Sequence, residues 1–254
     1  MLIDTHSHIY LKEFDNDIDD VIKNAVDAGV EKIILPNIDF YTINKMKNVK
    51  LAYPLITELA IGLHPTSVDA NYKKSLDLIF NDFNVSEYVA IGEVGIDLYW
   101  DKTFIKQQKT AFDYQIELAK KYNLPIIIHS RNYYDEIIDV LKPHIKSGIS
   151  GVFHCFPGNS NQAKMIIDMG FYIGIGGILT YKNSNMPEVV EKIPIEYVLL
   201  ETDAPYLSPV PKRGKRNEPA YVKYVAEEIS HITGTPFEDV CKITSDNAKQ
   251  VFYL

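Results

Sequence analysis

The stretch Leu2-Ile3-Asp4-Thr5-His6-Ser7-His8 begins as an apolar run and ends in two histidines. Because side chains alternate between the two faces of a β-strand, His6 and His8 point to the same side. Further segments dense in Ile, Val, Leu or Tyr follow, as expected for strands that are buried on both faces. With the opening stretch they predict eight strands, over residues 2–8, 32–38, 58–64, 88–97, 125–131, 151–156, 171–177 and 197–203.

Segments with a helical spacing of apolar residues separate these strands; Phe112, Ile116 and Ala119 form one such stripe. Strands that alternate with helices indicate a parallel sheet with right-handed crossovers. The chain has 254 residues, close to the roughly 250 that are typical of one (β/α)8 barrel. We therefore predict an α/β fold of the TIM (β/α)8 barrel type, with a doubly wound open sheet as the alternative.

The end of the chain predicts two more helices. The first covers residues 219–232, and the second opens at the capping box Thr235-Pro236-Phe237-Glu238 and runs to about Lys249. The second is an extra C-terminal helix beyond the barrel pattern. Length alone would also allow two small domains, but no linker, repeat or low-complexity run divides the sequence, so residues 1–254 are expected to form one domain.

Composition excludes some classes of protein. The net charge of −8 argues against a broad basic face that coats nucleic acid. It is compatible with an enzyme that binds a phosphate at a metal site, because the metal brings its own positive charge. The two cysteines do not form a disulfide framework. With no signal peptide and no membrane-spanning run recognised, we expect a cytoplasmic protein without a membrane association or an obligate protein partner.

Five of the seven histidines lie at or near the C-terminal ends of predicted strands: His6, His8, His64, His129 and His154. In a barrel these strand ends meet on one face, which carries the active site. Two carboxylates reach the same face, because Glu93 follows the apolar run at 89–92 and Asp203 ends the last predicted strand. A carboxylate placed there is costly to bury without a cation or hydrogen bonds.

The candidate metal ligands are the imidazoles and carboxylates that meet on this face: His6, His8, Glu93, His129, His154 and Asp203. Six ligands are too many for one tetrahedral zinc. They suit two divalent ions about 3.5–4 Å apart, bridged by a carboxylate and by a water or hydroxide that attacks the substrate. Glu93 is the candidate bridge and Asp203 the candidate base. Mixed nitrogen and oxygen ligation is compatible with Mg, Mn or Zn.

Further residues are expected around this centre. His64 is a candidate for contact with a substrate phosphate or for protonation of the leaving group; alternatively it caps the next segment. Arg213 and Asn217 lie in the basic loop after the last predicted strand. The planar guanidinium of Arg213 suits phosphate, the alternative being a solvated run of charge. Tyr99, Trp100 and Tyr206 lie near the rim, where aromatic rings can stack on a base or pack loops.

Structural roles are also considered for two residues next to the candidate ligands. Asp4 shares the strand face of His6, one layer deeper, and is expected either to orient a ligand histidine or to be a salt-bridged core aspartate. Cys155 alternates with His154 and is expected to face the helices and to be inert.

At this point the sequence resembles the TatD family. The resemblance rests on motifs in order along nearly the whole chain: His6-Ser7-His8, Gly62-Leu63-His64-Pro65, Gly92-Glu93-Val94-Gly95-Ile96-Asp97, His129-Ser130-Arg131, His154-Cys155-Phe156, Glu201-Thr202-Asp203-Ala204-Pro205-Tyr206-Leu207 and Arg213-Gly214-Lys215-Arg216-Asn217-Glu218-Pro219. Each motif alone is weak, but seven in order are specific. The family belongs to an amidohydrolase-like group of metal barrels and places its metal ligands on the same six residues. Related barrels with a carbamylated lysine have that lysine where Glu93 stands.

The resemblance implies a metal-dependent deoxyribonuclease, often a 3′→5′ exonuclease, with the 3′ ends of single-stranded or frayed DNA as substrate. One alternative is an amide or ester hydrolase, such as a D-aminoacyl-tRNA deacylase, because the same hydroxide can attack a carbonyl. Another is a non-enzymatic metal-binding module, although a structural site would not need open ligands at a barrel mouth.

Overall fold

The computed structural model describes residues 1–99, 101–131 and 134–254, so Trp100 lies outside the described residues. Eight strands form one sheet in chain order, and each hydrogen-bonded pair of neighbours is parallel. The strands are β1 (Leu2–Asp4), β2 (Val30–Pro36), β3 (Thr57–Ile61), β4 (Ala90–Asp97), β5 (Ile126–Arg131), β6 (Gly151–His154), β7 (Phe171–Ile175) and β8 (Val198–Leu200). The TIM-barrel prediction is confirmed.

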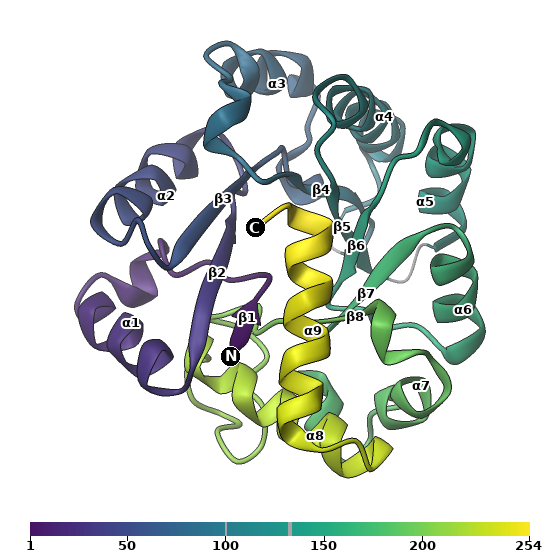
Figure 1. The fold of residues 1–254 in the computed structure, drawn as a ribbon. Helices are drawn as coiled ribbons and strands as arrows, with labels where there is room; N and C mark the ends of the chain where they lie inside the picture. The colour runs from purple at the N-terminus through teal and green to yellow at the C-terminus, as the bar shows by residue number, and fades with distance from the viewer. Residues whose placement is uncertain (100, 132–133) are drawn as a thin grey trace.

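Helices surround the sheet in sequence order, except for the last one, which crosses one end of the barrel (Figure 1). They are α1 (Ile18–Asp27), α2 (Phe40–Ala52), α3 (Tyr72–Phe80), α4 (Ile105–Tyr122), α5 (Tyr134–Leu141), α6 (Ser160–Asp168), α7 (Met186–Lys192), α8 (Val222–Thr233) and α9 (Phe237–Phe252). Each outer helix turns an apolar stripe toward the strands, as Ala111, Phe112 and Ile116 of α4 do. Among the described residues, no helix has the length and apolar character that a membrane crossing requires.

Hydrogen bonds beyond the ends of β1 and β8 close the barrel. Thr5 N donates to Leu200 O (2.9 Å), and Asp203 N donates to His6 O (2.9 Å). The buried Asp4 carboxylate accepts from Thr202 N at 2.9 Å, from the Thr202 hydroxyl at 2.6 Å and from His6 N at 3.3 Å. Asp4 therefore braces this seam through two main-chain amides and one hydroxyl, which differs from both roles expected of it.

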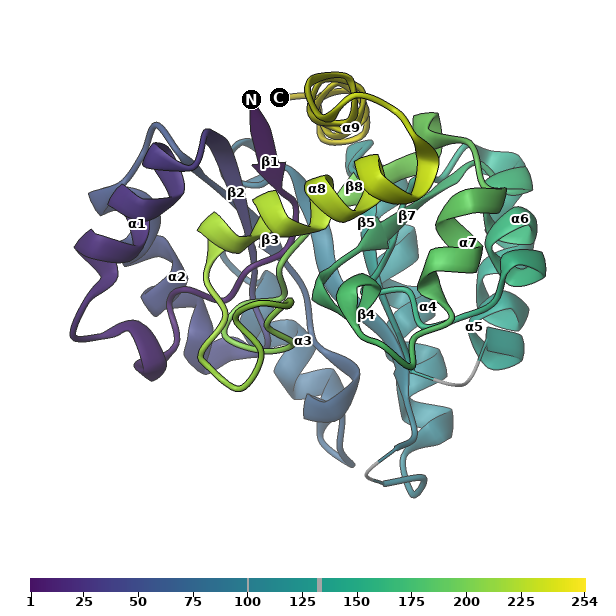
Figure 2. The ribbon, with the colours of Figure 1, turned by 90° about the horizontal axis from the view of Figure 1, so that it is seen from below.

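One end of the barrel is filled with apolar side chains and covered by the C-terminal helix. Each strand contributes one residue to this layer: Ile3, Ile34, Ala60, Ala90, Ile127, Val152, Tyr172 and Leu199. Ala248, Val251 and Phe252 of α9 pack against it, and α9 lies across the end of the barrel where both chain termini emerge (Figures 1 and 2). The extra helix is thus confirmed, and the polar residues described below lie at the opposite end.

The start of α9 differs from the predicted capping box. The helix begins at Phe237 after an extended Pro236, and no side chain caps it. Thr235 instead contacts the α8 end, where its hydroxyl lies 2.9 Å from that of Thr233 and its carbonyl accepts from Ser230 Oγ at 2.7 Å. The turn between α8 and α9 therefore uses the threonine that the capping box would have needed.

Candidate metal centre

The six candidate ligands come together at the C-terminal ends of the strands. His6 and His8 follow β1, Glu93 lies within β4, and His154 ends β6. Five of the six line a cavity of about 600 Å³, while His6 lies fully buried beside it. This is the end of a TIM barrel where active sites are built.

Glu93 lies between two sets of histidines. Its Oε2 atom is 3.2 Å from His6 Nε2 and 3.7 Å from His8 Nε2. Its Oε1 atom is 2.7 Å from both His129 Nδ1 and His154 Nε2, and 3.2 Å from His64 Nε2. Each oxygen of one buried carboxylate therefore faces its own group of nitrogen donors.

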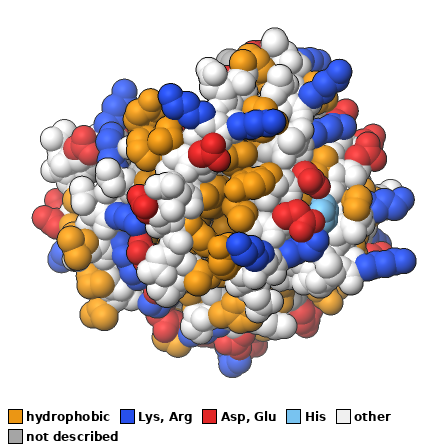
Figure 3. Space-filling model, turned by 90° about the horizontal axis from the view of Figure 1, so that it is seen from above, with side chains coloured by type: hydrophobic (Ala, Val, Ile, Leu, Met, Phe, Trp, Pro, Cys, Tyr) orange, Lys and Arg blue, Asp and Glu red, His pale blue; other side chains and the backbone are white. Residues whose placement is uncertain are grey.

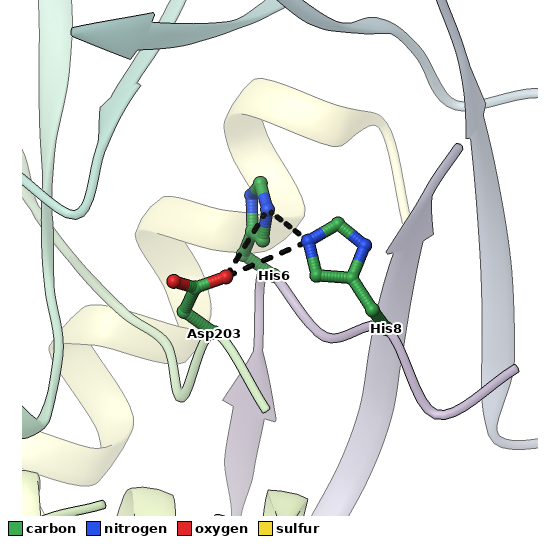
Figure 4. A group of neighbouring side chains, drawn as sticks. All are labelled: His6, His8 and Asp203. Atoms are coloured by element: carbon green, nitrogen blue, oxygen red, sulfur yellow. Dashed lines mark hydrogen bonds and ion pairs between the residues drawn. The ribbon is translucent and has the colours of Figure 1, made fainter. Parts of the chain in front are cut away.

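Asp203 completes the group on the Oε2 side. Its Oδ1 atom lies 3.8 Å from His6 Nε2 and 3.5 Å from His8 Nε2, and the three side chains converge in Figure 4. Strand β8 ends at Leu200, and Asp203 has a φ of 56°, in the left-handed region. The turn is held by the bond from Asp203 N to His6 O, so the carboxylate reaches the mouth although the strand stops short of it.

The donor set fits divalent cations. Three groups of side chains have ligand atoms that all lie within 4.8 Å of one another: His6 with His8 and Asp203, His6 with Glu93 and His154, and His64 with Glu93 and His129. Imidazole nitrogen and carboxylate oxygen are the donors that Zn, Mn and related ions take in proteins. The first two groups share His6, and the last two share Glu93. The arrangement therefore suits neighbouring ions with Glu93 between them.

Electrostatics explain how so many ionisable groups can be buried. Burial opposes ionisation of Glu93, but His154, His64 and His6 hold the pKa of its carboxyl well below the usual value. Burial likewise opposes protonation of His154, but Glu93 and Glu201 raise the pKa of its imidazole well above the usual value. A proton on His154 thus balances the Glu93 carboxylate, and a bound cation would replace that proton.

Two hydrogen-bonding residues behind the ligands were not predicted as site residues. Asp97 Oδ2 lies 2.9 Å from His129 Nε2, and the Tyr10 hydroxyl lies 2.8 Å from His8 Nδ1 and donates to Pro36 O at 2.5 Å. Such outer bonds fix the orientation of a ligand ring. The sequence could have indicated Asp97, because it follows Glu93 by four residues on the same strand and its side chain therefore lies on the same face.

Glu201 lies next to His154, one residue past the end of β8. It is fully buried, and its Oε1 atom accepts from Cys155 N at 2.5 Å and lies 3.7 Å from His154 Nδ1. Cys155 corrects the expectation that it faces the helices, because it lines the cavity. Its φ of 43° ends the strand alternation. Burial, together with Asp203 and Glu201, raises the pKa of its thiol well above the usual value, so the thiol stays protonated.

His64 caps the next segment, which is one of the two roles expected of it, and it also lines the cavity. Its Nδ1 accepts from Thr66 N at 3.1 Å and caps the short helical turn Pro65–Ser67. Its Nε2 faces Glu93, and the side chain lines the cavity. Since Nδ1 accepts a hydrogen bond, Nε2 carries the hydrogen of the neutral ring.

The loop after β8 is built differently from the prediction. Arg213 is exposed, stacks 4.2 Å from the Tyr181 ring centroid and is not among the residues that line the cavity. Asn217 is fully buried, and both its amide hydrogens are used, toward Thr202 O at 2.7 Å and Tyr206 O at 2.6 Å. It therefore holds the loop instead of offering a donor to substrate. Arg131, which stacks on Tyr99 at 3.6 Å, does line the cavity.

A second cavity, of about 460 Å³, lies on the outside of the barrel between α2 and the segment that leads into β4. No histidine is among the described residues that line it, and its lysines are paired, Lys50 with Glu58 at 2.8 Å and Lys47 with Glu87 at 2.7 Å. The metal-binding chemistry of the described chain is therefore concentrated at the barrel mouth.

Comparisons with known proteins agree with this geometry. The family model described as TatD related DNase matches residues 3–253. The chain is 42% identical to the uncharacterized metal-dependent hydrolase YabD of Bacillus subtilis, covering 100% of both. It is 32% identical to a Salmonella typhimurium protein named 3′-5′ ssDNA/RNA exonuclease TatD, covering 99% of this chain and 98% of the relative. The crystal structure of the TatD homolog YjjV from Escherichia coli matches with a TM-score of 0.92 at 31% identity, covering 100% of this chain and 98% of the other.

Proposed function

Because the chain belongs to the TatD family of metal-dependent hydrolases, we propose that it is a deoxyribonuclease that removes nucleotides from the 3′ ends of single-stranded or frayed DNA. The observation that carries the proposal is the Glu93 carboxylate, whose two oxygens face separate groups of histidines inside one open cavity. The name of the Salmonella relative supports nucleic acid as the substrate class. We further propose that residues 1–254 act as one cytoplasmic domain without an obligate protein partner.

The metal-binding residues have distinct proposed places. Two divalent ions, Mg, Mn or Zn, would be held by His6, His8 and Asp203 on one side of Glu93 and by His129 and His154 on the other. When bound, such ions acidify water and neutralise charge on a phosphate.

Asp203 is the proposed general base. Burial opposes its ionisation, but His8, His6 and His154 lower the pKa of its carboxyl below the usual value, so it is ionised and able to accept a proton at neutral pH. Its side chain lines the cavity and is 15% exposed. An attacking water can therefore reach it from the open side, as a general base requires.

Substrate contacts are assigned to the rim. His64 would donate its Nε2 hydrogen to a phosphate or leaving oxygen, since its other nitrogen is engaged by Thr66. Arg131 lines the cavity, its guanidinium stacks on Tyr99, and this planar fork suits phosphate. Arg213 stacks on Tyr181, farther from the metal centre. It would contact a phosphate farther along the same DNA strand.

The surface favours holding the substrate by its end. With a net charge of −8, the protein has no excess of positive charge to spread along a polymer. On the side that carries α3 and α4, lysines and arginines are interspersed with acidic side chains around hydrophobic ones (Figure 3). A free strand end reaches the barrel mouth easily, whereas the middle of a stiff duplex would have to bend around the loops.

The test uses purified protein that has been stripped with a chelator and reloaded with Mg²⁺, Mn²⁺ or Zn²⁺. A linear single-stranded oligonucleotide labelled at its 5′ end should shorten stepwise, and a circular single strand of similar composition should resist. The Asp203→Asn protein, prepared in parallel, controls for contaminating nuclease.

Other outcomes would replace the proposal. Equal cleavage of circular and linear strands would rule out end recognition. Hydrolysis of a D-aminoacyl-tRNA without cleavage of DNA or RNA would indicate an ester hydrolase. Tight metal binding without hydrolysis of any of these substrates would indicate a metal-binding module.

A further inference from the structure

The rim of the cavity has two chemically different arcs. The loops after the neighbouring strands β6, β7 and β8 supply Pro157, Ile178, Tyr206 and Leu207; these four residues are the apolar wall. The residues that follow or end β3 and β5 supply the other arc, His64, Thr66, Ser130 and Arg131, the polar arc. Five of the six candidate metal ligands line the same cavity as the two arcs. A ligand at the centre would therefore have an apolar part on one side and polar groups on the other.

Tyr206 is the dominant side chain of the apolar wall, and its backbone is firmly held. It is 50% exposed, and Leu207 beside it is 37% exposed. Tyr206 N donates to Asp203 O at 2.8 Å, and Tyr206 O accepts from the buried Asn217 at 2.6 Å. The Tyr206 ring centroid lies 6.5 Å from that of His8, so this aromatic surface adjoins the candidate metal centre. Exposed apolar surface fixed beside a reactive centre is typical of a ligand-binding surface.

The polar arc supplies an imidazole, a hydroxyl side chain and a guanidinium side chain. His64 and Thr66 line the cavity from the segment after β3. Arg131 supplies positive charge. This side of the cavity therefore suits the sugar and phosphate of a nucleotide.

We propose that the apolar wall is a nucleobase subsite that holds the 3′-terminal base of the strand by stacking on Tyr206, while the sugar and phosphate face the polar arc. This inference rests on the proposed nuclease function and adds the feature of the substrate that is recognised. A single-stranded end presents the face of its base freely, and stacking on an aromatic ring does not depend on base identity. A paired terminal base is already stacked and must separate before it reaches the wall, so preference for single-stranded or frayed ends follows.

The test compares two linear single-stranded oligonucleotides that differ only at the 3′-terminal nucleotide, which carries either adenine or an abasic tetrahydrofuran. The value of kcat/KM for removing this nucleotide is measured for the wild type, Tyr206→Ala and Tyr206→Phe, all loaded with the same metal. The wild type should prefer adenine by about 5- to 150-fold, the range expected for stacking of one base. Tyr206→Ala should bring the ratio close to one, whereas Tyr206→Phe should keep most of it.

A matched control separates stacking from structure. Tyr253 is 65% exposed and lies at the end of α9, at the other end of the barrel, and Tyr253→Ala should keep the wild-type ratio. If Tyr206→Ala slows removal of both termini equally, the ratio stays unchanged and the subsite is refuted, because a merely structural role would give that result.

A binding measurement distinguishes this inference from the proposed function. Calorimetry on the metal-loaded protein should show deoxyadenosine monophosphate binding more tightly than 2-deoxyribose 5-phosphate, and Tyr206→Ala should remove the difference. Equal binding of the two ligands to the wild type would overturn the subsite even if the protein is a nuclease. Failure to cleave any nucleic acid would overturn the nuclease proposal, and the base-dependent difference in binding would then still decide the subsite.

Discussion

Replacing Asp97 with asparagine should loosen the metal centre without unfolding the protein. Asp97 is 4% exposed; its Oδ1 accepts from Tyr99 N at 2.8 Å, and its Oδ2 lies 2.9 Å from His129 Nε2. Burial opposes ionisation, but the contacts with His129 and Tyr99 lower the pKa of the carboxyl, so Asp97 is charged. It therefore holds a hydrogen on His129 Nε2, so that Nδ1, which faces Glu93, can offer its lone pair when a cation replaces the hydrogen there.

Asparagine keeps the shape of the Asp97 side chain but replaces one acceptor oxygen with an NH2 group, which is a hydrogen-bond donor. If its oxygen continues to accept from Tyr99 N, its NH2 group faces His129 Nε2 and favours the tautomer with the hydrogen on Nδ1. That tautomer removes the lone pair from the side where a cation would bind. Loss of an outer hydrogen bond to a ligand histidine typically costs 10–100-fold in metal affinity or activity, or about 1.4–2.7 kcal/mol.

Calorimetric titration of the chelator-stripped protein with Mn²⁺ would measure the effect, alongside kcat and KM on single-stranded DNA. One class of bound ion should weaken by the stated factor, and kcat should fall more than KM changes. Asp77→Asn, the same chemical change on an exposed part of α3, should leave both unchanged. Metal affinity within twofold of wild type, with activity retained, would refute the orienting role of Asp97.

Asp203→Asn should reduce turnover by about 10²–10⁴-fold, the usual contribution of a general base, while gel-shift measurements show DNA binding retained. Arg131→Ala should weaken single-strand binding by roughly 1–3 kcal/mol, as expected for a lost charge-assisted bond, and by more than Arg213→Ala does; a larger effect of Arg213 in fluorescence anisotropy would reverse this assignment. Metal affinity should rise with pH, because the pKa of the His154 imidazole is raised well above its usual value and a cation must displace its proton at any pH below that pKa. Calorimetry in buffers of different ionisation enthalpy should detect the released proton. The logarithm of the DNA-binding constant should fall with the logarithm of salt concentration with a slope of roughly −1 to −3, at about −0.7 per phosphate on single strands, and a steeper slope would require a basic track.

Strand periodicity explains why Glu93 and His129 could be placed from the sequence. Glu93 and Asp97 lie on one strand, β4, where a period of two residues dictates that their side chains share a face. His129 is likewise held by the pairing of β5 with both neighbours. Strand order along the chain then brings these faces together at the mouth. What the period could not supply was the hydrogen bond between Asp97 and His129, which depends on the register between two strands.

Residues in loops were placed less well, because no period governs them. Cys155 follows His154 by one residue, but its positive φ turns it into the cavity instead of toward the helices. Asn217 and Arg213 share a loop whose path is determined by distant partners. Asn217 is held inward by the carbonyls of Thr202 and Tyr206. Composition indicated a basic loop at the mouth but not which of its side chains would face the substrate.

Asp203 shows how a loop residue can still be predicted. It lies beyond the end of β8 and has a positive φ, so the strand argument does not strictly apply to it. The chain nevertheless continues beside the β1 extension, because Asp203 N donates to His6 O at 2.9 Å and His8 N donates to Ala204 O at 2.7 Å. These bonds close the barrel and also bring Asp203 against the two histidines. The seam that completes the fold therefore builds one side of the metal centre, and loss of barrel closure and loss of that side should occur together.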